Sequence, residues 1–340
     1  MKKEMCVRLA RCLIVVLLVT AMMPMQPKRV QAATTISMTM YVGEDGNVIV
    51  DMFTDENKVK SIKSSNSKVV KASKNRDGGS IFVWARKKGT ATVTVQTKSK
   101  TIKYKITVVP LDFQASLSVK ADSGRYSVKV KNNSKIPITD FRVSCTIAYR
   151  RSDGEMVYDA YPHIFTESGK VLFQNETMTE VVDLSDYCEK NEYTLVPEEC
   201  SVQEVTADRK LDCIYKDLSS NVKFKVRSAE VEKASPLKYL NVEYDLKNPL
   251  KKEQRYNYLT GKGAYTEGYL ECRLYNRKDQ LLGIQYLSAD FTKSNLNNKK
   301  ENVYPIVRIP LKDIYWNGYH HYKIIPHVYQ SKSLYQYVND

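Results

Sequence analysis

The chain has 340 residues, and its formal net charge is +15 at neutral pH. Tyrosine occurs 24 times, and valine, threonine and serine are common, a composition that favours β-strands. No long segment combines helical periodicity with capping signals, and after residue 32 no apolar run reaches membrane-spanning length. These features exclude helical bundles and multi-pass helical membrane proteins, so we predict an all-β fold.

Residues 1–32 have the three parts of a secretory signal peptide. A basic start that includes Lys2 and Arg11 precedes an apolar run over residues 13–23, and Val30-Gln31-Ala32 lies where signal peptidase would act. The alternative is an uncleaved membrane anchor. Eleven helical residues at about 1.5 Å each span only about 16 Å, against about 30 Å of hydrocarbon. We therefore predict cleavage after Ala32 or Ala33 and no transmembrane segment in the mature chain.

The first predicted module covers residues 33–109. Ala91, Val93 and Val95 alternate with threonines, which is typical of a strand with one face in a core. Turn signals occur at Asp45-Gly46, Asp77-Gly78-Gly79 and Lys88-Gly89. The strands are expected at residues 35–42, 47–53, 81–86, 90–97 and 101–109. Short strands at this density predict a β-sandwich.

Three segments of this module follow one another in a recognisable order. They are Ser64-Ser65-Asn66 with Val69 after it, Val83-Trp84-Ala85, and Gly89-Thr90-Ala91-Thr92-Val93. The stretch resembles the bacterial immunoglobulin-like domain of the group 2 type. The family often has tryptophan at the position of Ile62, so a core side chain differs here. The resemblance implies an extracellular, usually surface-associated module that acts as a spacer or adhesive unit, and it brings no catalytic residues.

The rest of the chain shows an internal repeat. Val130-Lys131-Asn132 recurs as Leu246-Lys247-Asn248, and Tyr193-Thr194-Leu195-Val196-Pro197 recurs as Tyr322-Lys323-Ile324-Ile325-Pro326. The order is kept, as a tandem duplication with insertions would produce. We predict two further antiparallel β-sandwich modules, at residues 110–220 and 221–340, joined by short linkers into a linear string. Residues 251–268 would form a long hairpin or surface loop in the last module.

Five cysteines remain after cleavage, so at least one stays outside any intramolecular disulfide. They are Cys145, Cys188, Cys200, Cys213 and Cys272. Cys145 and Cys272 occupy matching repeat positions among apolar neighbours, and we predict that both are buried as small hydrophobic side chains. One disulfide could form among the other three. No spacing suggests a metal site.

The positive charge is concentrated in the first module. Residues 33–109 hold 14 basic and 6 acidic residues, a net +8, whereas residues 110–340 carry only +2. Such a surface attracts polyanions, which outside a cell are wall polymers, acidic polysaccharides or anionic lipid head groups. Nucleic acid fits the charge equally well, but export argues against it. The alternative is a lysine-rich face that only keeps the module soluble.

Aromatic residues are the candidates for a binding surface. If Val83 and Ala85 point inward, Phe82 and Trp84 point outward, and Arg86, Lys87 and Lys88 follow them directly. A second cluster contains Tyr315, Trp316 and Tyr319. The alternatives are packing against the next module for the first cluster and filling of a sheet end for the second.

Enzyme motifs are missing from the sequence: it has no nucleophile elbow, P-loop, dinucleotide fingerprint or zinc-protease motif. The four histidines, His163, His320, His321 and His327, have no metal-ligand partner at useful spacing. We therefore predict a secreted or surface-associated, non-catalytic protein without a cofactor or metal. It would bind cell-wall polymer, glycan or extracellular protein in a structural or adhesive role. The alternatives are a carbohydrate-binding protein that uses exposed aromatics, and an enzyme with an unfamiliar site.

Overall fold

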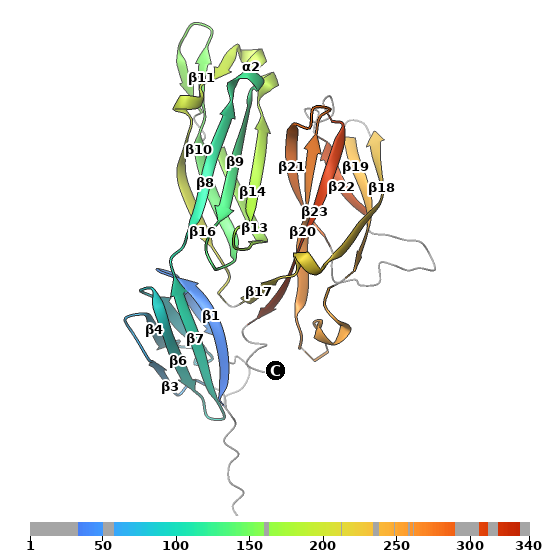
Figure 1. Cartoon of the computed structure of the whole chain (residues 1–340). Coiled ribbons are helices and arrows are strands. Elements are labelled where there is room, and N and C mark those ends of the chain that lie inside the picture. Colours follow the sequence, from blue (N-terminus) through green and yellow to red (C-terminus); the bar gives the residue numbers. More distant parts are fainter. Residues whose placement is uncertain are drawn as a thin grey trace, which may run out of the picture.

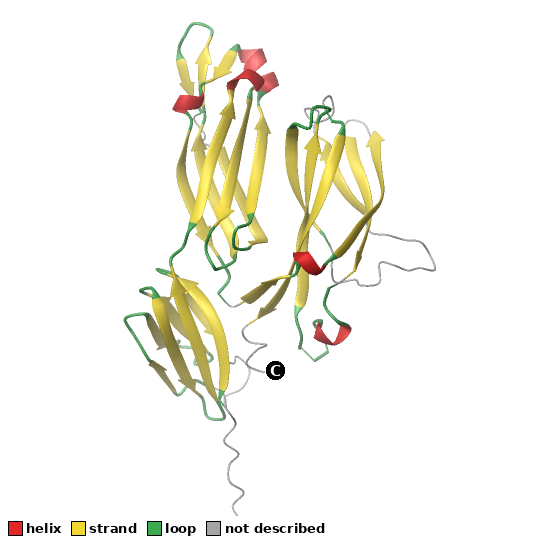
Figure 2. Cartoon of the chain, viewed as in Figure 1, coloured by secondary structure: helices red, strands yellow, loops and turns green. Residues whose placement is uncertain are grey.

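A computed structural model describes most of the chain after residue 32. The described residues are 33–49, 58–159, 163–211, 213–233, 238–247, 249–257, 259–260, 262–289, 306–311 and 319–333. Figure 2 shows that strands dominate these residues, and they form separate sheets. The all-β, β-sandwich fold is therefore confirmed, whereas the predicted signal peptide at 1–32 lies outside the described residues.

The first module consists of two sheets packed face to face (Figure 1). One sheet has the order β1 (Thr34–Tyr41), β7 (Thr101–Val109), β6 (Gly89–Gln96) and β3 (Ser61–Ser64). The other has the order β2 (Asp45–Ile49), β5 (Ser80–Ala85) and β4 (Val70–Lys74). The inward positions of the alternating strands are fully buried, as Ile81, Val93 and Tyr104 show. The strands on which the resemblance was based therefore build this core.

Two details of the first module differ from the prediction. Strand β1 pairs parallel to β7, so this sandwich is not purely antiparallel. Asp45-Gly46 is not a turn, because both residues lie in β2 opposite Trp84 and Val83. The chain reverses instead at Val42-Gly43, where Gly43 has a φ of 94°, a conformation that glycine adopts without strain. The predicted turns at Asp77-Gly78-Gly79 and Lys88-Gly89 are confirmed.

The second module has two main sheets and a small one at its far end (Figure 1). The main sheets have the orders β14 (Thr177–Asp183), β9 (Arg125–Asn132), β8 (Phe113–Lys120) and β13 (His163–Leu172), β10 (Ile138–Thr146), β16 (Ser201–Asp208). The small sheet has the order β12 (Met156–Tyr158), β11 (Ala148–Arg151), β15 (Tyr193–Leu195). The short helix α2 (Ser185–Asn191) and the 3-10 turns η2 (Ala121–Ser123) and η3 (Pro197–Glu199) lie between strands. The pair Asp153-Gly154, a sequence typical of tight turns, lies in the turn that joins β11 to β12.

The third module has one four-stranded and one three-stranded sheet. Their orders are β17 (Cys213–Asp217), β23 (His321–Ser333), β20 (Tyr265–Tyr275), β21 (Leu281–Ser288) and β18 (Lys223–Lys233), β19 (Lys238–Lys247), β22 (Ile306–Leu311). The 3-10 turns are η4 (Ser219–Asn221) and η5 (Lys252–Gln254). Because β17 pairs with β23, Cys213–Asp217 share a sheet with the third module, although they precede the predicted boundary at residue 220. The sequence also contains Asn317-Gly318, a pair typical of tight turns, which lies outside the described residues.

The second and third modules share one topology. The sheet order β14-β9-β8 of the second module corresponds to β22-β19-β18 of the third. In the same way, β13-β10-β16 corresponds to β21-β20-β23. Cys145 on β10 and Cys272 on β20 lie on the strands that join both neighbours in their sheets, and both are fully buried as predicted. No disulfide links the cysteines of the described chain. The shared order supports the proposed duplication.

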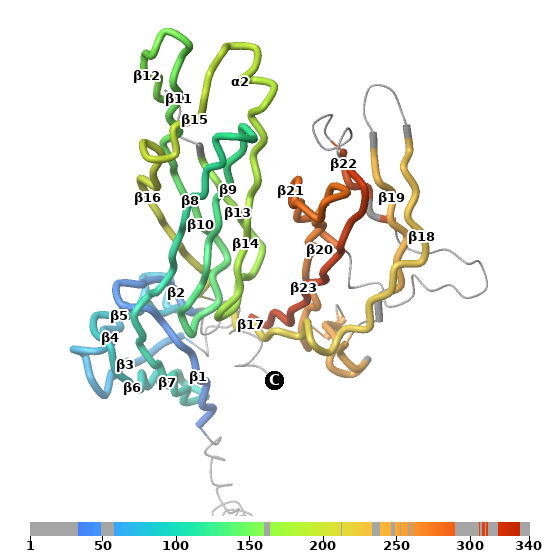
Figure 3. Tube along the Cα trace, turned by 45° about the horizontal axis from the view of Figure 1, so that its top comes forward, coloured from blue at the N-terminus to red at the C-terminus, as the bar shows by residue number. Residues whose placement is uncertain are grey.

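The modules do not form a straight string. The third module folds back so that it lies beside the second, while the first continues below the second (Figures 1 and 3). Tyr269 and Tyr329 of the third module are buried in one apolar cluster with the core of the second. In addition, the hydroxyl of Tyr286 accepts a hydrogen bond of 2.7 Å from the Thr179 backbone N–H and donates one to its carbonyl. The predicted linear arrangement is therefore wrong.

Candidate functional site

The aromatic pair predicted on β5 has the expected orientation. Val83 and Ala85 are fully buried, whereas the Trp84 side chain points outward and is 39% exposed. Phe82 lies two residues before Trp84 on the same face and is half-buried. The period-two geometry of a strand produces this division. Trp84 is therefore exposed, as the alternation along β5 predicts.

The turn after β5 holds several cations beside this tryptophan. The backbone N–H of Arg86 donates a 2.8 Å hydrogen bond to the carbonyl of Val69, which ties the turn to the loop before β4. Gly89 ends the turn with a φ of 148°, and a Cβ added there would lie 3.1 Å from Cγ2 of Val69. Close packing of Val69 on a glycine thus fixes Arg86, Lys87 and Lys88 in place.

Two neighbouring strands complete the surface. Lys71 on β4 and Asp45 on β2 are the direct cross-strand neighbours of Trp84. The guanidinium carbon of Arg86 lies 5.0 Å from the centre of the Trp84 ring, a cation–π contact. We define the Trp84 patch by one aromatic and five exposed basic residues: Trp84, Lys68, Lys71, Arg86, Lys87 and Lys88.

Acidic residues do little to neutralise this module. Thirteen of its fourteen basic residues are exposed, and Lys100 is half-buried. Among the described acidic residues, Glu44 is buried in an ion pair with Arg209. Asp77 lies in the β4–β5 turn, where hydrogen bonds from Ser80 and Gly79 hold its pKa below the ordinary value. Asp45 is therefore the described acid that faces the patch.

The second predicted cluster is only partly described. Tyr315 and Trp316 lie outside the described residues. Tyr319 is half-buried and packs against the core of the third module, and burial raises its pKa to about 12. The structure therefore places Tyr319 at a sheet end, which is the alternative that the sequence had left open, and does not place it beside Phe82 and Trp84.

No catalytic or metal constellation emerges from the described part of the chain. No three His, Cys, Asp or Glu side chains there group closely enough to hold a metal ion. His327 is half-buried, with Nε2 2.8 Å from the Glu271 carboxylate and Nδ1 3.6 Å from that of Glu176. This cluster joins the second and third modules. Among the same residues, no helix is long and apolar enough to cross a bilayer.

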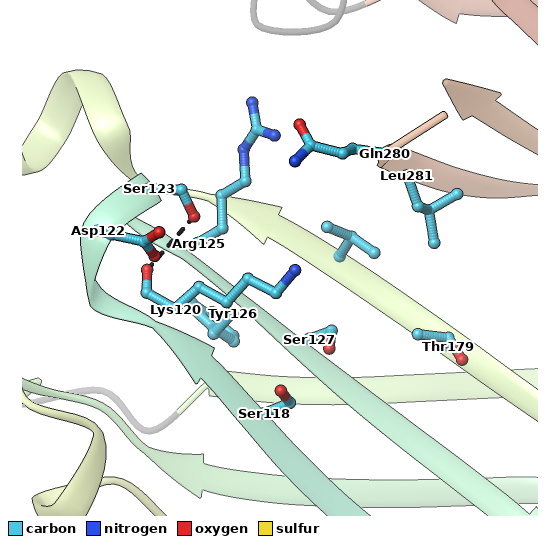
Figure 4. Close-up of a pocket in the computed structure, with 11 residues that line it drawn as sticks. Ser118, Lys120, Asp122, Ser123, Arg125, Tyr126, Ser127, Thr179, Gln280 and Leu281 are labelled. Carbon is cyan, nitrogen blue, oxygen red and sulfur yellow. Dashed lines mark hydrogen bonds between the residues drawn. The ribbon is translucent and has the colours of Figure 1, made fainter. Parts of the chain in front are cut away.

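A cavity between the second and third modules was not predicted from the sequence. Residues of β8, β9 and β14 form one wall, and Gln280 and Leu281 of the third module form the other (Figure 4). The lining mixes hydroxyl, charged and apolar side chains that form no local sequence motif. The cavity forms because the two modules pack side by side, and no single segment of the sequence predicts that packing.

Comparisons with known proteins identify no family. No protein-family model matches the sequence, and no curated protein matches it significantly. One solved structure with a xylogluco-oligosaccharide is 9% identical, with a TM-score of 0.17, and the match covers 86% of this chain and 77% of that one. A mutant of Salmonella alpha-2-macroglobulin is 9% identical, with a TM-score of 0.13, and the match covers 87% of this chain and 21% of that one. Likeness at this level supports no functional argument.

Proposed function

We propose that this is an exported, non-catalytic β-sandwich protein that binds an anionic extracellular polymer through the Trp84 patch. One observation carries the proposal: five exposed cations surround an exposed tryptophan, and one described acid, Asp45, faces them. The resemblance of residues 34–109 to a surface-associated module and the signal-like residues 1–32 support a location outside the cell. The role would be structural or adhesive.

The geometry of the patch suits a polymer better than a single small anion. The Arg86 backbone is hydrogen-bonded to Val69, the residue after Lys68, and Lys71 extends the positive surface along β4. Exposed charges attract one another weakly across a screening length of about 8–10 Å, so a useful affinity requires several contacts at once. A chain with repeated phosphate or carboxylate groups provides those contacts.

A second candidate is a neutral glycan that stacks on the aromatic pair. Trp84 and Phe82 lie on one face of β5, two residues apart, as stacking on successive sugar rings would require. Arg86 already lies over the Trp84 ring, however, and occupies part of the stacking surface. We therefore rank this candidate below the anionic polymer.

Binding of the purified mature chain to defined polymers tests the proposal. Poly(glycerol phosphate) and polygalacturonate serve as anionic probes, and dextran serves as the neutral probe. We expect binding to both anionic polymers, weakened at least about tenfold between low and physiological salt because added ions screen exposed charges. Salt-insensitive binding to dextran would favour stacking, and binding to none of the polymers would contradict the proposal.

Substitution of the tryptophan separates the patch from the overall charge. Trp84→Ala removes the ring under Arg86 without changing the net charge, and we expect it to weaken binding to the anionic polymers several-fold. Tyr158→Ala is the matched control, because Tyr158 is an exposed aromatic on β12 of the second module, 50% exposed. Equal effects of the two substitutions would argue against a role for Trp84.

A further inference from the structure

A polar cavity lies where the outer face of one sheet of the second module meets the third module. Its volume is about 270 Å³, close to the lower end of the range of about 300–1,000 Å³ for small-ligand pockets. In Figure 4, Ser118, Ser127 and Thr179 lie on the strands below, while Gln280 and Leu281 approach from the opposite module. Such a space fits one ring-sized ligand.

The strand register arranges the wall of this cavity as rows of side chains. Ser118, Ser127 and Val181 form one cross-strand row, from β8 through β9 to β14. Lys120 and Arg125 lie in the next row along the strands. Because alternate residues of adjacent strands face the same side, these side chains converge on one patch of the sheet. The wall is therefore rich in hydroxyl groups that can both donate and accept hydrogen bonds.

The charged groups of the wall balance one another. Arg125 donates from Nε to the buried carboxylate of Asp183 at 2.5 Å, and Asp183 also accepts hydrogen bonds from the backbone N–H and hydroxyl of Ser185. This arrangement fixes Arg125, and Figure 4 shows its guanidinium extending toward Gln280. Lys120 adds a second positive charge, and Asp122 a second negative one. The site therefore presents fixed donors and acceptors without a net formal charge.

Apolar groups occupy the remaining part of the lining. Leu281 of the third module and Val181 of the second both border the cavity. A ligand that matches this lining has one apolar face, a rim of hydroxyl groups and no charge. The two modules must stay docked for the two walls to meet, and the pair of hydrogen bonds between Tyr286 and Thr179 holds them together at this point.

We propose that this cavity binds a single uncharged sugar ring, either as a free monosaccharide or as one residue of a longer glycan. The ring face would pack on Leu281 and Val181, and the sugar hydroxyls would exchange hydrogen bonds with Ser118, Ser127 and the Arg125 guanidinium. The proposal is independent of the Trp84 patch, which lies on another module and would bind a polymer by charge.

Saturation-transfer NMR and calorimetry with the full mature chain test this proposal. The neutral probes are glucose, galactose, mannose, xylose and N-acetylglucosamine, and the anionic probes are glucuronate and inorganic phosphate. We expect at least one neutral sugar to bind, and phosphate not to compete with it. Failure of all neutral sugars to bind, or binding of the anions alone, would overturn the proposal.

Two positions on one strand provide a matched pair of variants. Ser118→Trp fills the cavity, whereas Ser116→Trp places the same side chain on the same face of β8, two residues away and outside the lining. We expect the first to weaken sugar binding at least about tenfold and the second to leave it unchanged. Retained binding in Ser118→Trp would overturn the proposal.

A second, smaller substitution tests the proposal in case Ser118→Trp does not fold. Ser127→Ala removes one hydroxyl from the lining without adding volume, and we expect it to weaken binding several-fold. Unchanged affinity in this variant would also count against the proposal. Trp84→Ala should leave sugar binding intact, so the failure of this proposal is distinguishable from the failure of the polymer proposal.

Discussion

Glu44 and Arg209 form a buried ion pair although 165 residues separate them in the sequence. Arg209 Nε lies 2.7 Å from Glu44 Oε1, and the two side chains are 7% and 2% exposed. Arg209 also donates to the carbonyl of Thr39. The segment after β16 is thereby attached to the first module, and Leu211, two residues later, packs against the core of that module.

Arg209→Ala should therefore destabilise the first module. The substitution leaves the Glu44 carboxylate buried without its partner, which typically costs about 3–5 kcal/mol. Urea unfolding monitored by Trp84 fluorescence in a Trp316→Phe background measures this loss, and Arg142→Ala on the exposed face of β10 is the control. The double variant Glu44→Leu with Arg209→Met should recover most of the stability. Wild-type stability in Arg209→Ala would show that the ion pair contributes nothing.

Tyr286→Phe should loosen the contact between the second and third modules. It removes both hydrogen bonds to the Thr179 backbone but keeps the ring packed edge-on against Tyr269. We expect a loss of about 1–2 kcal/mol and faster hydrogen exchange of the Thr179 amide. Tyr158→Phe, whose hydroxyl contacts Glu199 at the surface, is the control. Unchanged exchange at Thr179 would contradict the observed contact.

The contact between these modules should also weaken at high pH. Burial of His327 favours the neutral ring, but hydrogen bonds with Glu176 and Glu271 outweigh this effect and raise its pKa to about 9. Because the folded pKa lies above the ordinary value of about 6.5, the stabilisation is complete below pH 6.5 and is lost as the pH rises through about 9.

We expect the stability of the third module to fall by roughly 1–3 kcal/mol across this window. Thermal unfolding of the wild type and of His327→Gln at a series of pH values measures the change. The variant should be less stable at pH 6 and nearly independent of pH up to 9. A wild-type profile without a decline above pH 7 would refute the assignment of a charged His327.

Cys145 and Cys272 should be inert in the folded protein. Both are fully buried, and burial raises the pKa of the Cys145 thiol to about 11 and that of Cys272 to about 12. A thiolate is the reactive form, so alkylation at neutral pH should spare both residues until the protein unfolds. Mass spectrometry after brief iodoacetamide treatment locates the modified cysteines. Rapid labelling of either residue in native protein would contradict its burial.

Much of the fold follows from local patterns in the sequence. Alternation of apolar residues with threonine at 90–95 predicts β6 directly, and the burial of Val83 and Ala85 follows from the same periodicity. The repeat matched Cys145 to Cys272, and both proved to lie on strands of equivalent position. These features depend on neighbouring residues in one strand, which is why they could be predicted.

Features that depend on distant segments could not be predicted in this way. The parallel pairing of β1 with β7 joins two strands about 60 residues apart, and β17 joins the third module because β23 lies beside it. The cavity wall formed by Ser118 and Leu281 exists only because the modules fold back on each other. A two-residue pattern such as Asp45-Gly46 also mispredicts a turn when both residues pair with a neighbouring strand, here β5.

The most direct test of the central claim compares two triple variants with equal charge. One replaces Lys71, Lys87 and Lys88 of the Trp84 patch by glutamine, and the other replaces Lys63, Lys98 and Lys103, three exposed lysines outside the patch. If the patch binds the polymer, affinity for poly(glycerol phosphate) should fall roughly 10- to 100-fold in the first and only slightly in the second. Equal losses in the two variants would show that overall charge, and not the Trp84 patch, attracts the polymer.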